Sequence, residues 1–191
     1  MYEIEVKFQF PNQTLEEIKQ KLSLKIVDWS KPKVQNDTVF LSKNKTSYKI
    51  VEGDKIFRIR QEFFDGEQQG ITSILALKIQ QAQKLVSQEY ETEFADVNQM
   101  TSILESLELV KFVNVIKKRS KAKFENYNLC LDEVQDLGVF LEVELLSEKQ
   151  IDFDVAQVQI VEFVKTLDLP DFVVNMTPYD TQIFNKKGLP K

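Results

Sequence analysis

The chain has 191 residues, of which 42% are hydrophobic and 29% are charged, and its formal net charge is −5. This length and apolar content predict a single folded domain spanning residues 1–191, and they exclude an intrinsically disordered chain. The acidic balance argues against a nucleic-acid-binding protein that relies on a broad basic surface, although it leaves room for a local basic pocket.

Histidine is absent from the sequence, and cysteine occurs once, as Cys130. The first fact excludes zinc sites built from histidine and cysteine, histidine general bases and Ser–His–Asp triads. A metal ion would have to be held by carboxylates and water, which favours Mg²⁺ or Mn²⁺. The lone cysteine, the lack of an apolar run of about 18 residues and the lack of a signal-peptide core predict a cytoplasmic protein with no membrane partner.

The chain opens with YEIEVKFQF, a stretch with strict alternation between ionic and apolar residues. Such alternation predicts a strand with two different faces. The ionic face carries Glu3, Glu5 and Lys7, and the apolar face carries Ile4, Val6, Phe8 and Phe10.

Three helices are predicted along the chain. Thr14 and Glu17 have the spacing of a capping box, which indicates a helix start. Asp96 is placed as the N-cap of a second helix, and an apolar band from about Asp154 to Leu167 indicates a third.

Most of the remaining chain is predicted as strand, and because helices are too few to alternate with strands, the sheet should be largely antiparallel. The predicted strands are Tyr2–Phe10, Asp37–Ser42, Ser47–Glu52, Lys55–Glu62, Ile74–Ile79, Ser87–Phe94, Val113–Lys121, Lys123–Leu131 and Val139–Leu146.

The ionic face of the first strand recurs in later strands. The bases on these faces are Lys7, Arg58, Arg60, Lys78, Lys117 and Arg119. The acids are Glu3, Glu5, Glu91, Glu93, Asp132, Glu142 and Glu144. One such strand alone indicates a solvated face, but several together favour a sheet closed into a barrel whose bore they line. Converging bases suit a polyphosphate, and the carboxylates suit the divalent cation that accompanies it.

Three stretches carry a family resemblance: YEIEVKF, the block KKRSKAKF followed by LDEVQDLGVFLEVE, and TPYDTQIF near the end. Together they resemble the CYTH superfamily, the triphosphate tunnel metalloenzymes, and most closely its class IV adenylate cyclase branch. The last stretch departs from that branch, because Pro178 precedes Tyr179 and Ile183–Phe184 stand where the branch has two leucines.

The resemblance implies an α+β, mainly antiparallel fold: a closed barrel of about eight strands, the triphosphate tunnel, with a few flanking helices. It implies catalytic roles for Glu3, Glu5, Lys7, Lys117 and Arg119. It implies a triphosphate cradle made of Lys7, Arg58, Arg60, Lys78, Lys117 and Arg119. It implies Mg²⁺ or Mn²⁺ ligands among Glu3, Glu5, Glu142, Glu144 and Asp132, with Asp132 either contributing to the metal or holding a base in place.

The resemblance leaves the reaction open. In a cyclase, the ribose 3′-hydroxyl of ATP attacks the α-phosphorus and yields cyclic AMP and pyrophosphate. In a tripolyphosphatase or thiamine triphosphatase, water attacks the terminal phosphorus and releases orthophosphate. A non-catalytic module that binds polyphosphate or nucleotide is a third alternative, which the number of acids disfavours. All three have a nucleotide or another triphosphate as partner.

Two expectations concern single features. If the ionic faces point inward, the apolar faces point outward, and an apolar belt left uncovered by the helices would make a homodimer interface. Cys130 lacks a histidine to activate it, so it is expected to be a small filler and not a nucleophile.

Overall fold

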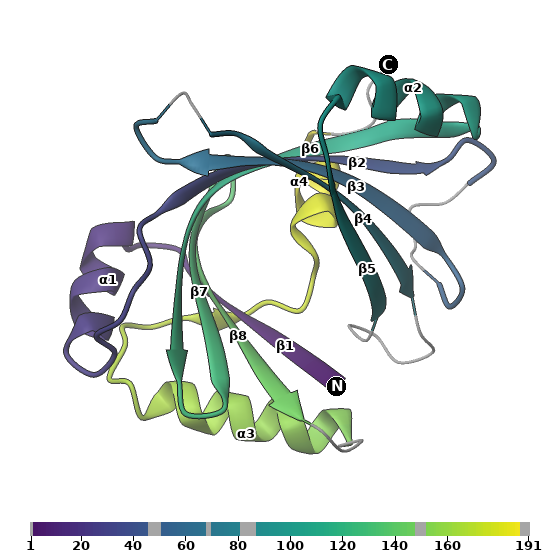
Figure 1. Ribbon diagram of the computed structural model, residues 1–191. Coiled ribbons are helices and arrows are strands. Elements are labelled where there is room, and N and C mark those ends of the chain that lie inside the picture. The colour runs from purple at the N-terminus through teal and green to yellow at the C-terminus, as the bar shows by residue number, and fades with distance from the viewer. Residues whose placement is uncertain (1, 46–50, 68–69, 81–86, 148–151, 188–191) are drawn as a thin grey trace. The chain divides into compact units, whose positions relative to one another are not determined.

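The computed structural model describes residues 2–45, 51–67, 70–80, 87–147 and 152–187 (Figure 1). Its chain forms two compact units. The first unit comprises Met1–Lys33 and Lys117–Met176, and the second comprises Val34–Ile116 and Thr177–Lys191.

The first unit is an antiparallel sheet with two helices. Its hydrogen-bonded strand order is β6-β7-β8-β1-β9. The strands are β1 (Tyr2–Phe10), the second half of β6 (Leu109–Phe124), β7 (Tyr127–Val134), β8 (Gly138–Ser147) and the short β9 (Val173–Val174); the helices are α1 (Leu15–Ser23) and α3 (Phe153–Lys165).

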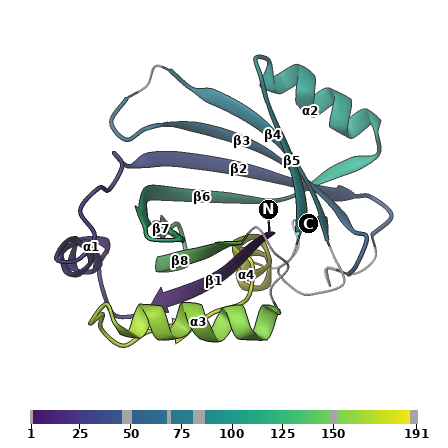
Figure 2. The same ribbon diagram turned by 60° about the horizontal axis from the view of Figure 1, so that its bottom comes forward.

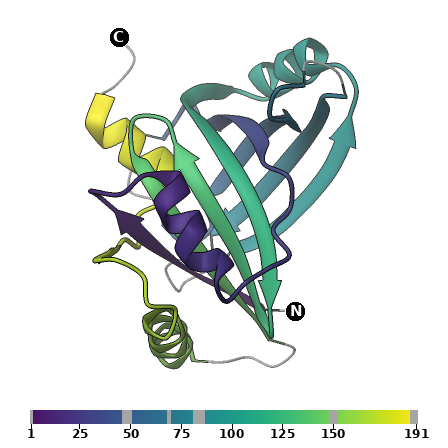
Figure 3. The ribbon, with the colours of Figure 1, turned by 90° about the vertical axis from the view of Figure 1, so that its left-hand side faces the viewer.

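The core of the first unit lies between the apolar face of this sheet and the two helices. Helix α3 runs along β1 and β8, and α1 lies against β7 (Figures 2 and 3). The apolar side chains predicted to share one face of β1 are all buried here. They pack with Ile18 and Leu22 of α1 and with Ile160 and Val164 of α3. Because strand side chains alternate, burying this face places the ionic residues of β1 on the other face.

The second unit has the strand order β5-β4-β3-β2-β6. Its elements are β2 (Lys33–Ser42), β3 (Lys55–Phe64), β4 (Thr72–Gln80), β5 (Ser87–Phe94), the first half of β6, α2 (Val97–Ser106) and α4 (Tyr179–Lys187). Helix α2 packs its Leu104 against Phe40 and Ile59. Helix α4 places Phe184 on Phe112 of β6, with ring centroids 4.9 Å apart.

The predicted helices are confirmed. Thr14 and Glu17 form the capping box that starts α1, and the Asp96 side chain accepts a hydrogen bond from the Gln99 N–H at the start of α2. Helix α3 covers most of the third predicted segment. Helix α4 was not predicted, because its sequence YDTQIFNKK lacks a regular apolar stripe and is held by tertiary contacts of Tyr179 and Ile183, both buried.

The predicted strands are confirmed apart from three differences. The break predicted between Lys121 and Lys123 is wrong, since β6 continues to Phe124 and the turn follows at Glu125, whose backbone φ is +54°. Strand β9 was not predicted, since two residues carry too little pattern. The strand predicted at Ser47–Glu52 falls largely outside the described residues.

The prediction of a closed eight-stranded barrel is corrected. Over the described residues, the structure has a nine-stranded sheet with two edges, at β5 and β9. Closure requires hydrogen bonds between the first and last strands. Here β9 pairs with β1 at Phe8 and Gln9, so part of the edge of β1 is already used. The mainly antiparallel α+β class is confirmed.

Within the described part of the chain, no helix combines the length and the apolar character needed to cross a bilayer.

Candidate functional site

Charged side chains gather in two clusters, one in each unit. We call the first ionic cluster Glu5, Lys7, Arg119, Asp132, Glu142 and Glu144, all in the first unit. The strand register brings them together, because Lys7 pairs with Glu142, Glu5 with Glu144 and Arg119 with Asp132 on adjacent strands. These side chains occupy the face of the sheet opposite the apolar core.

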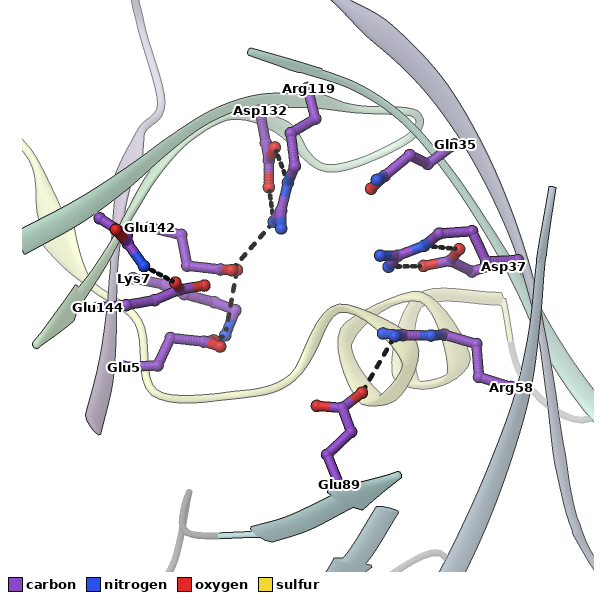
Figure 4. Close-up of polar contacts among 12 residues, drawn as sticks. Glu5, Lys7, Gln35, Asp37, Arg58, Glu89, Arg119, Asp132, Glu142 and Glu144 are labelled. Carbon is purple, nitrogen blue, oxygen red and sulfur yellow. Dashed lines mark hydrogen bonds and ion pairs between the residues drawn. The ribbon is translucent and has the colours of Figure 1, made fainter. Parts of the chain in front are cut away.

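Arg119 is the best-fixed base of the first ionic cluster. Its Nε and Nη2 donate to the two carboxylate oxygens of Asp132 at 2.7 and 2.5 Å, and Nη2 also donates to Glu142 at 3.0 Å (Figure 4). Arg119 is 7% exposed, and Asp132 is fully buried. Burial by itself lowers the pKa of Arg119, but the charges of Asp132 and Glu142 raise the pKa well above its ordinary value. The guanidinium therefore stays charged although it is removed from water.

Lys7 lies beside two carboxylates. It forms ion pairs with Glu5 and with Glu142, the latter at 3.5 Å, and it is 7% exposed. Lys117 is also buried, two residues before Arg119 on β6 and thus on the same face. The structure therefore brings Lys7 and Arg119 onto the same carboxylate, Glu142. The side chain of Glu3 lies outside the described part of the structure.

Acidic ligand atoms converge on β7 and β8. One ligand atom each from Cys130, Glu142 and Glu144 lies within 4.8 Å of the others. The Asn128 side-chain amide donates to Glu144 at 3.3 Å and orients that carboxylate. Carboxylate oxygens are the ligands that Mg²⁺ and Mn²⁺ prefer, so Glu142 and Glu144 are suited to bind the divalent cation predicted from the sequence.

Asp132 has a different environment from these glutamates. Both of its oxygens accept hydrogen bonds from Arg119. Of the two roles predicted for Asp132, this contact supports the one in which it holds a base in place.

Cys130 faces the same side of β7 as Asp132 and lies opposite Glu142 in the register. Burial and the nearby carboxylates raise the pKa of its thiol to about 12, and Arg119 only partly offsets this. A thiol that stays protonated is a poor nucleophile, in keeping with the predicted role of Cys130 as a filler.

We call the second ionic cluster Asp37, Arg58, Arg60, Lys78, Glu89 and Glu91, all in the second unit. Its buried pair repeats the geometry of Arg119 and Asp132. Nε and Nη2 of Arg60 donate to the two oxygens of Asp37, both at 2.7 Å. The exposed fractions are 8% for Arg60 and 3% for Asp37.

The other two bases of this cluster are paired with acids of β5. Arg58 donates to Glu89 at 3.1 Å (Figure 4). Arg58 also donates to Glu91 at 2.9 Å, and Lys78 lies 3.2 Å from Glu89. Burial raises the pKa of Glu89, but Lys78 and Arg58 together outweigh it, so the pKa is lowered overall. Glu93 faces Ile74 in the β4–β5 register.

Sequence reasoning missed Asp37, Glu89 and Asn128. The signal for Asp37 was present: Gln35 and Asp37 continue the face that carries Val39 and Leu41, so a polar pair precedes two apolar residues on one side of the strand. Glu89 lies two residues before Glu91, and because strand side chains alternate, the two glutamates share one face of β5. Nothing in the local pattern around Asn128 identifies it, since its role comes from the cross-strand partner Glu144.

Comparison with known proteins agrees with this architecture. The "Putative adenylate cyclase MJ0240" of Methanocaldococcus jannaschii is 29% identical over 167 residues, which cover 87% of this chain and 89% of that protein. The solved structure of the PH1819 protein from Pyrococcus horikoshii OT3 matches with a TM-score of 0.78 at 23% identity, over 97% of this chain and 100% of that one. A solved structure from Vibrio parahaemolyticus, titled as a "putative adenylate cyclase", matches with a TM-score of 0.71 at 13% identity, over 96% and 98%.

At these identities the two solved structures show a common fold. The family model described as the CYTH domain matches residues 1–172. Because that match spans most of the chain, this protein belongs to the CYTH domain family.

Proposed function

We propose that this protein is a metal-dependent phosphoryl-transfer enzyme that converts ATP to cyclic AMP and pyrophosphate, in the manner of a class IV adenylate cyclase. One observation carries the proposal: Arg119 and Arg60 are each buried, charged and held through two hydrogen bonds by their own aspartate. Burying an arginine is costly unless its charge is paired, and a guanidinium that a partner holds in one orientation is well suited to bind phosphate oxygens. The name of the Methanocaldococcus jannaschii relative favours the cyclase over other triphosphate chemistry.

The bases have the task of binding and orienting the triphosphate. In the first unit we assign this role to Arg119, Lys7 and Lys117, and in the second unit the second ionic cluster offers bases of the same kind, Arg58, Arg60 and Lys78. A triphosphate carries about four negative charges near neutral pH, so its binding displaces Glu89 and Glu91 from Arg58 and Lys78 by charge competition. Asp132 and Asp37 keep the two buried guanidiniums in place, because each aspartate accepts two hydrogen bonds from its arginine.

The acids have the task of holding the divalent cation. Glu5, Glu142 and Glu144, with Glu3 from the opening motif, are the residues we assign to Mg²⁺ or Mn²⁺. When bound, such an ion neutralises charge on phosphate oxygens and lowers the pKa of an oxygen nucleophile.

The reaction then depends on alignment more than on covalent help from the protein. The ribose 3′-oxygen forms a bond to the α-phosphorus, the bond between the α-phosphorus and pyrophosphate breaks, and the hydroxyl proton is released. Arg119 and Lys7 stabilise the charge that develops on the phosphoryl oxygens, since both lie in a site from which most water is removed.

A product assay tests the proposal. The purified protein is given ATP, inorganic tripolyphosphate and thiamine triphosphate in turn, with Mg²⁺ or Mn²⁺, at neutral and alkaline pH. We expect cyclic AMP and pyrophosphate from ATP. Orthophosphate as the sole product would overturn the cyclase and establish the alternative, a tripolyphosphatase or thiamine triphosphatase. Binding of these ligands without any turnover would establish a non-catalytic binding module.

A matched pair of variants separates site chemistry from general charge effects. Arg119→Lys keeps the charge and loses the two-point hydrogen bonding, so turnover should fall by about a hundredfold or more. Lys165→Gln removes an exposed charge on α3 of the same unit, where it pairs with Glu162, and should leave turnover within about twofold.

The homodimer remains part of the proposal. Val155 and Val158 of α3 are 51% and 61% exposed, and they give the first unit an apolar surface on which a second copy could pack. Light scattering at micromolar concentration tests it: a dimer mass supports the proposal, and a monomer mass contradicts it.

A further inference from the structure

Two buried polar atoms of the second unit have no hydrogen-bond partner among the described residues. They are the side-chain oxygen Oε1 of Gln35 and the Nε of Arg58. Gln35 as a whole is only 2% exposed. Such atoms are uncommon in folded proteins, because a buried polar group has lost its hydrogen bonds to water and normally replaces them. The first atom needs a donor and the second needs an acceptor.

The two atoms lie on the same face of the sheet. Gln35 stands two residues before Asp37 on β2, and Arg58 stands two residues before Arg60 on β3, so alternation places each on the face of the Asp37–Arg60 pair. Figure 4 shows the side chains of Gln35, Asp37 and Arg58 extending from the sheet toward the same side. The three form part of one polar surface.

A contact with Glu62 fixes the orientation of the Gln35 amide. Gln35 Nε2 donates to a carboxylate oxygen of Glu62 at 2.9 Å. An ionised carboxylate only accepts hydrogen bonds, so the NH₂ of the amide must face Glu62 and the oxygen must face away from it. Rotating the amide would bring two acceptors together. The missing partner of Gln35 is therefore a donor.

The order of these groups along β3 defines the shape of a ligand that would satisfy them. Arg58, Arg60 and Glu62 follow one another on one face, and the four residues from first to last span about 13 Å. A ligand that contacts both arginines and Gln35 is therefore elongated. It is anionic where it contacts the arginines and carries a hydroxyl or amino donor where it contacts Gln35.

The two halves of this requirement distinguish between triphosphates. An ionised phosphate chain offers only acceptors, so it can satisfy Arg58 Nε but not Gln35 Oε1. A nucleoside triphosphate adds donors, namely the ribose hydroxyls and the amino group of adenine. Inorganic tripolyphosphate has no such group and would leave the Gln35 oxygen buried without a partner, which costs free energy.

We propose that Gln35 is a specificity-determining residue, whose Oε1 accepts a hydrogen bond from a hydroxyl or amino group of the nucleoside part of the substrate while Arg58 and Arg60 bind its phosphates. The protein thereby prefers nucleoside triphosphates to inorganic tripolyphosphate. This inference deepens the proposed function and rests on its triphosphate-binding site, but its readout is binding and needs no turnover.

The test compares two ligands on wild type and Gln35→Met, which keeps the length of the side chain and removes the acceptor. The ligands are ATP and tripolyphosphate analogues with methylene groups in place of the bridging oxygens, so that neither is turned over. By calorimetry with Mg²⁺ present, we expect the variant to bind the ATP analogue about tenfold more weakly, as for one lost hydrogen bond. Its affinity for the tripolyphosphate analogue should stay within about twofold.

The control is Gln99→Met, an exposed position on α2 of the same unit, and it should leave both affinities unchanged. A purely structural role of Gln35 would give a different result, because a disturbed sheet face would weaken the binding of both ligands alike. Circular dichroism and thermal melts establish that Gln35→Met is folded.

A series of nucleotides identifies the donor and needs no folded variant. The 2′-deoxy and 3′-deoxy forms of the ATP analogue each lack one hydroxyl, and the inosine form lacks the amino group. One of the three should bind wild type about tenfold more weakly than the parent analogue, and Gln35→Met should bind that form and the parent equally well.

Three outcomes would overturn the inference: an unchanged affinity of folded Gln35→Met for the ATP analogue, an equal loss for both ligands, or wild-type binding that is the same for all the nucleotides. Failure of the proposed function is distinguishable. In that case Gln35 discriminates between the ligands as described, but the product assay with ATP yields no cyclic AMP.

Discussion

Arg119 and Asp132 face one another across β6 and β7, and both oxygens of the aspartate accept a hydrogen bond from the one guanidinium. Asp37 and Arg60 repeat this relationship in the second unit, with two hydrogen bonds of 2.7 Å. In each pair the aspartate is almost completely buried, so it has little contact with solvent and its carboxylate binds the arginine. In each pair, the guanidinium is charged and held in place, so its N–H groups that do not contact the aspartate can bind an anion.

Removing the charge of Asp132 should destabilise the protein. In Asp132→Asn, Arg119 remains buried with one carboxylate fewer, and breaking a buried pair in this way costs about 3–5 kcal/mol. We expect the free energy of unfolding, measured by urea denaturation, to fall by about 3 kcal/mol. Glu133→Gln, on the exposed face of the same strand, serves as the control and should change it by less than about 0.5 kcal/mol. Equal stability of the two variants would mean that the pair is not a structural anchor.

Replacing Arg60 by lysine should weaken triphosphate binding without loss of the fold. Lysine keeps the charge but cannot hold Asp37 and a phosphate at once through a planar group, and the loss of one charge-assisted hydrogen bond corresponds to about tenfold in affinity. Calorimetry with inorganic tripolyphosphate measures this. The control is Lys55→Gln on the same strand, where the side chain is exposed. A wild-type affinity in Arg60→Lys would remove Arg60 from the cradle.

Glu142 should be required for Mg²⁺ binding. Glu142→Gln removes a negative charge from the group of ligand atoms that includes Glu144, and the Mg²⁺ affinity is expected to fall by roughly tenfold or more. Calorimetric titration of the metal-free variant checks this, with circular dichroism to confirm that the fold persists after Arg119 loses a partner. If Glu142→Gln binds Mg²⁺ as the wild type does, the metal is held elsewhere.

Glu89 should make the second unit sensitive to acid. Its pKa in the folded protein is lowered from the ordinary value of 4.5, since Lys78 and Arg58 outweigh the effect of burial. A group with a lowered folded pKa contributes its stabilisation above the unfolded value and loses it as the pH falls through the folded value. The contribution is therefore complete above about pH 5 and disappears at lower pH.

Comparing thermal melts of wild type and Glu89→Gln between pH 7 and pH 3 measures this effect. The two curves should differ near neutral pH and converge in acid. A constant difference across the range would show that the charge of Glu89 does not contribute.

The local pattern of the sequence was sufficient for the two-faced strands and the first three helices. Alternation of side chains is a property of each strand alone, so Glu5 and Lys7 could be separated from Val6 and Phe8 without knowing any partner. The capping box of Thr14 and Glu17 is likewise complete within four residues. The match of the CYTH family model to residues 1–172 agrees with the resemblance carried by these patterns.

Which side chains meet was decided by tertiary structure. Asp37 contacts Arg60, and Asp132 contacts Arg119, because strand pairing and packing bring together segments that are distant in the sequence. The same holds for the two sheet edges, which depend on where β9 pairs with β1, and for α4, whose weak apolar pattern is compensated by the contact of Phe184 with Phe112. Periodicity determines the direction of a side chain from its own backbone, whereas its partner depends on register, and register is set by the burial of the whole sheet face.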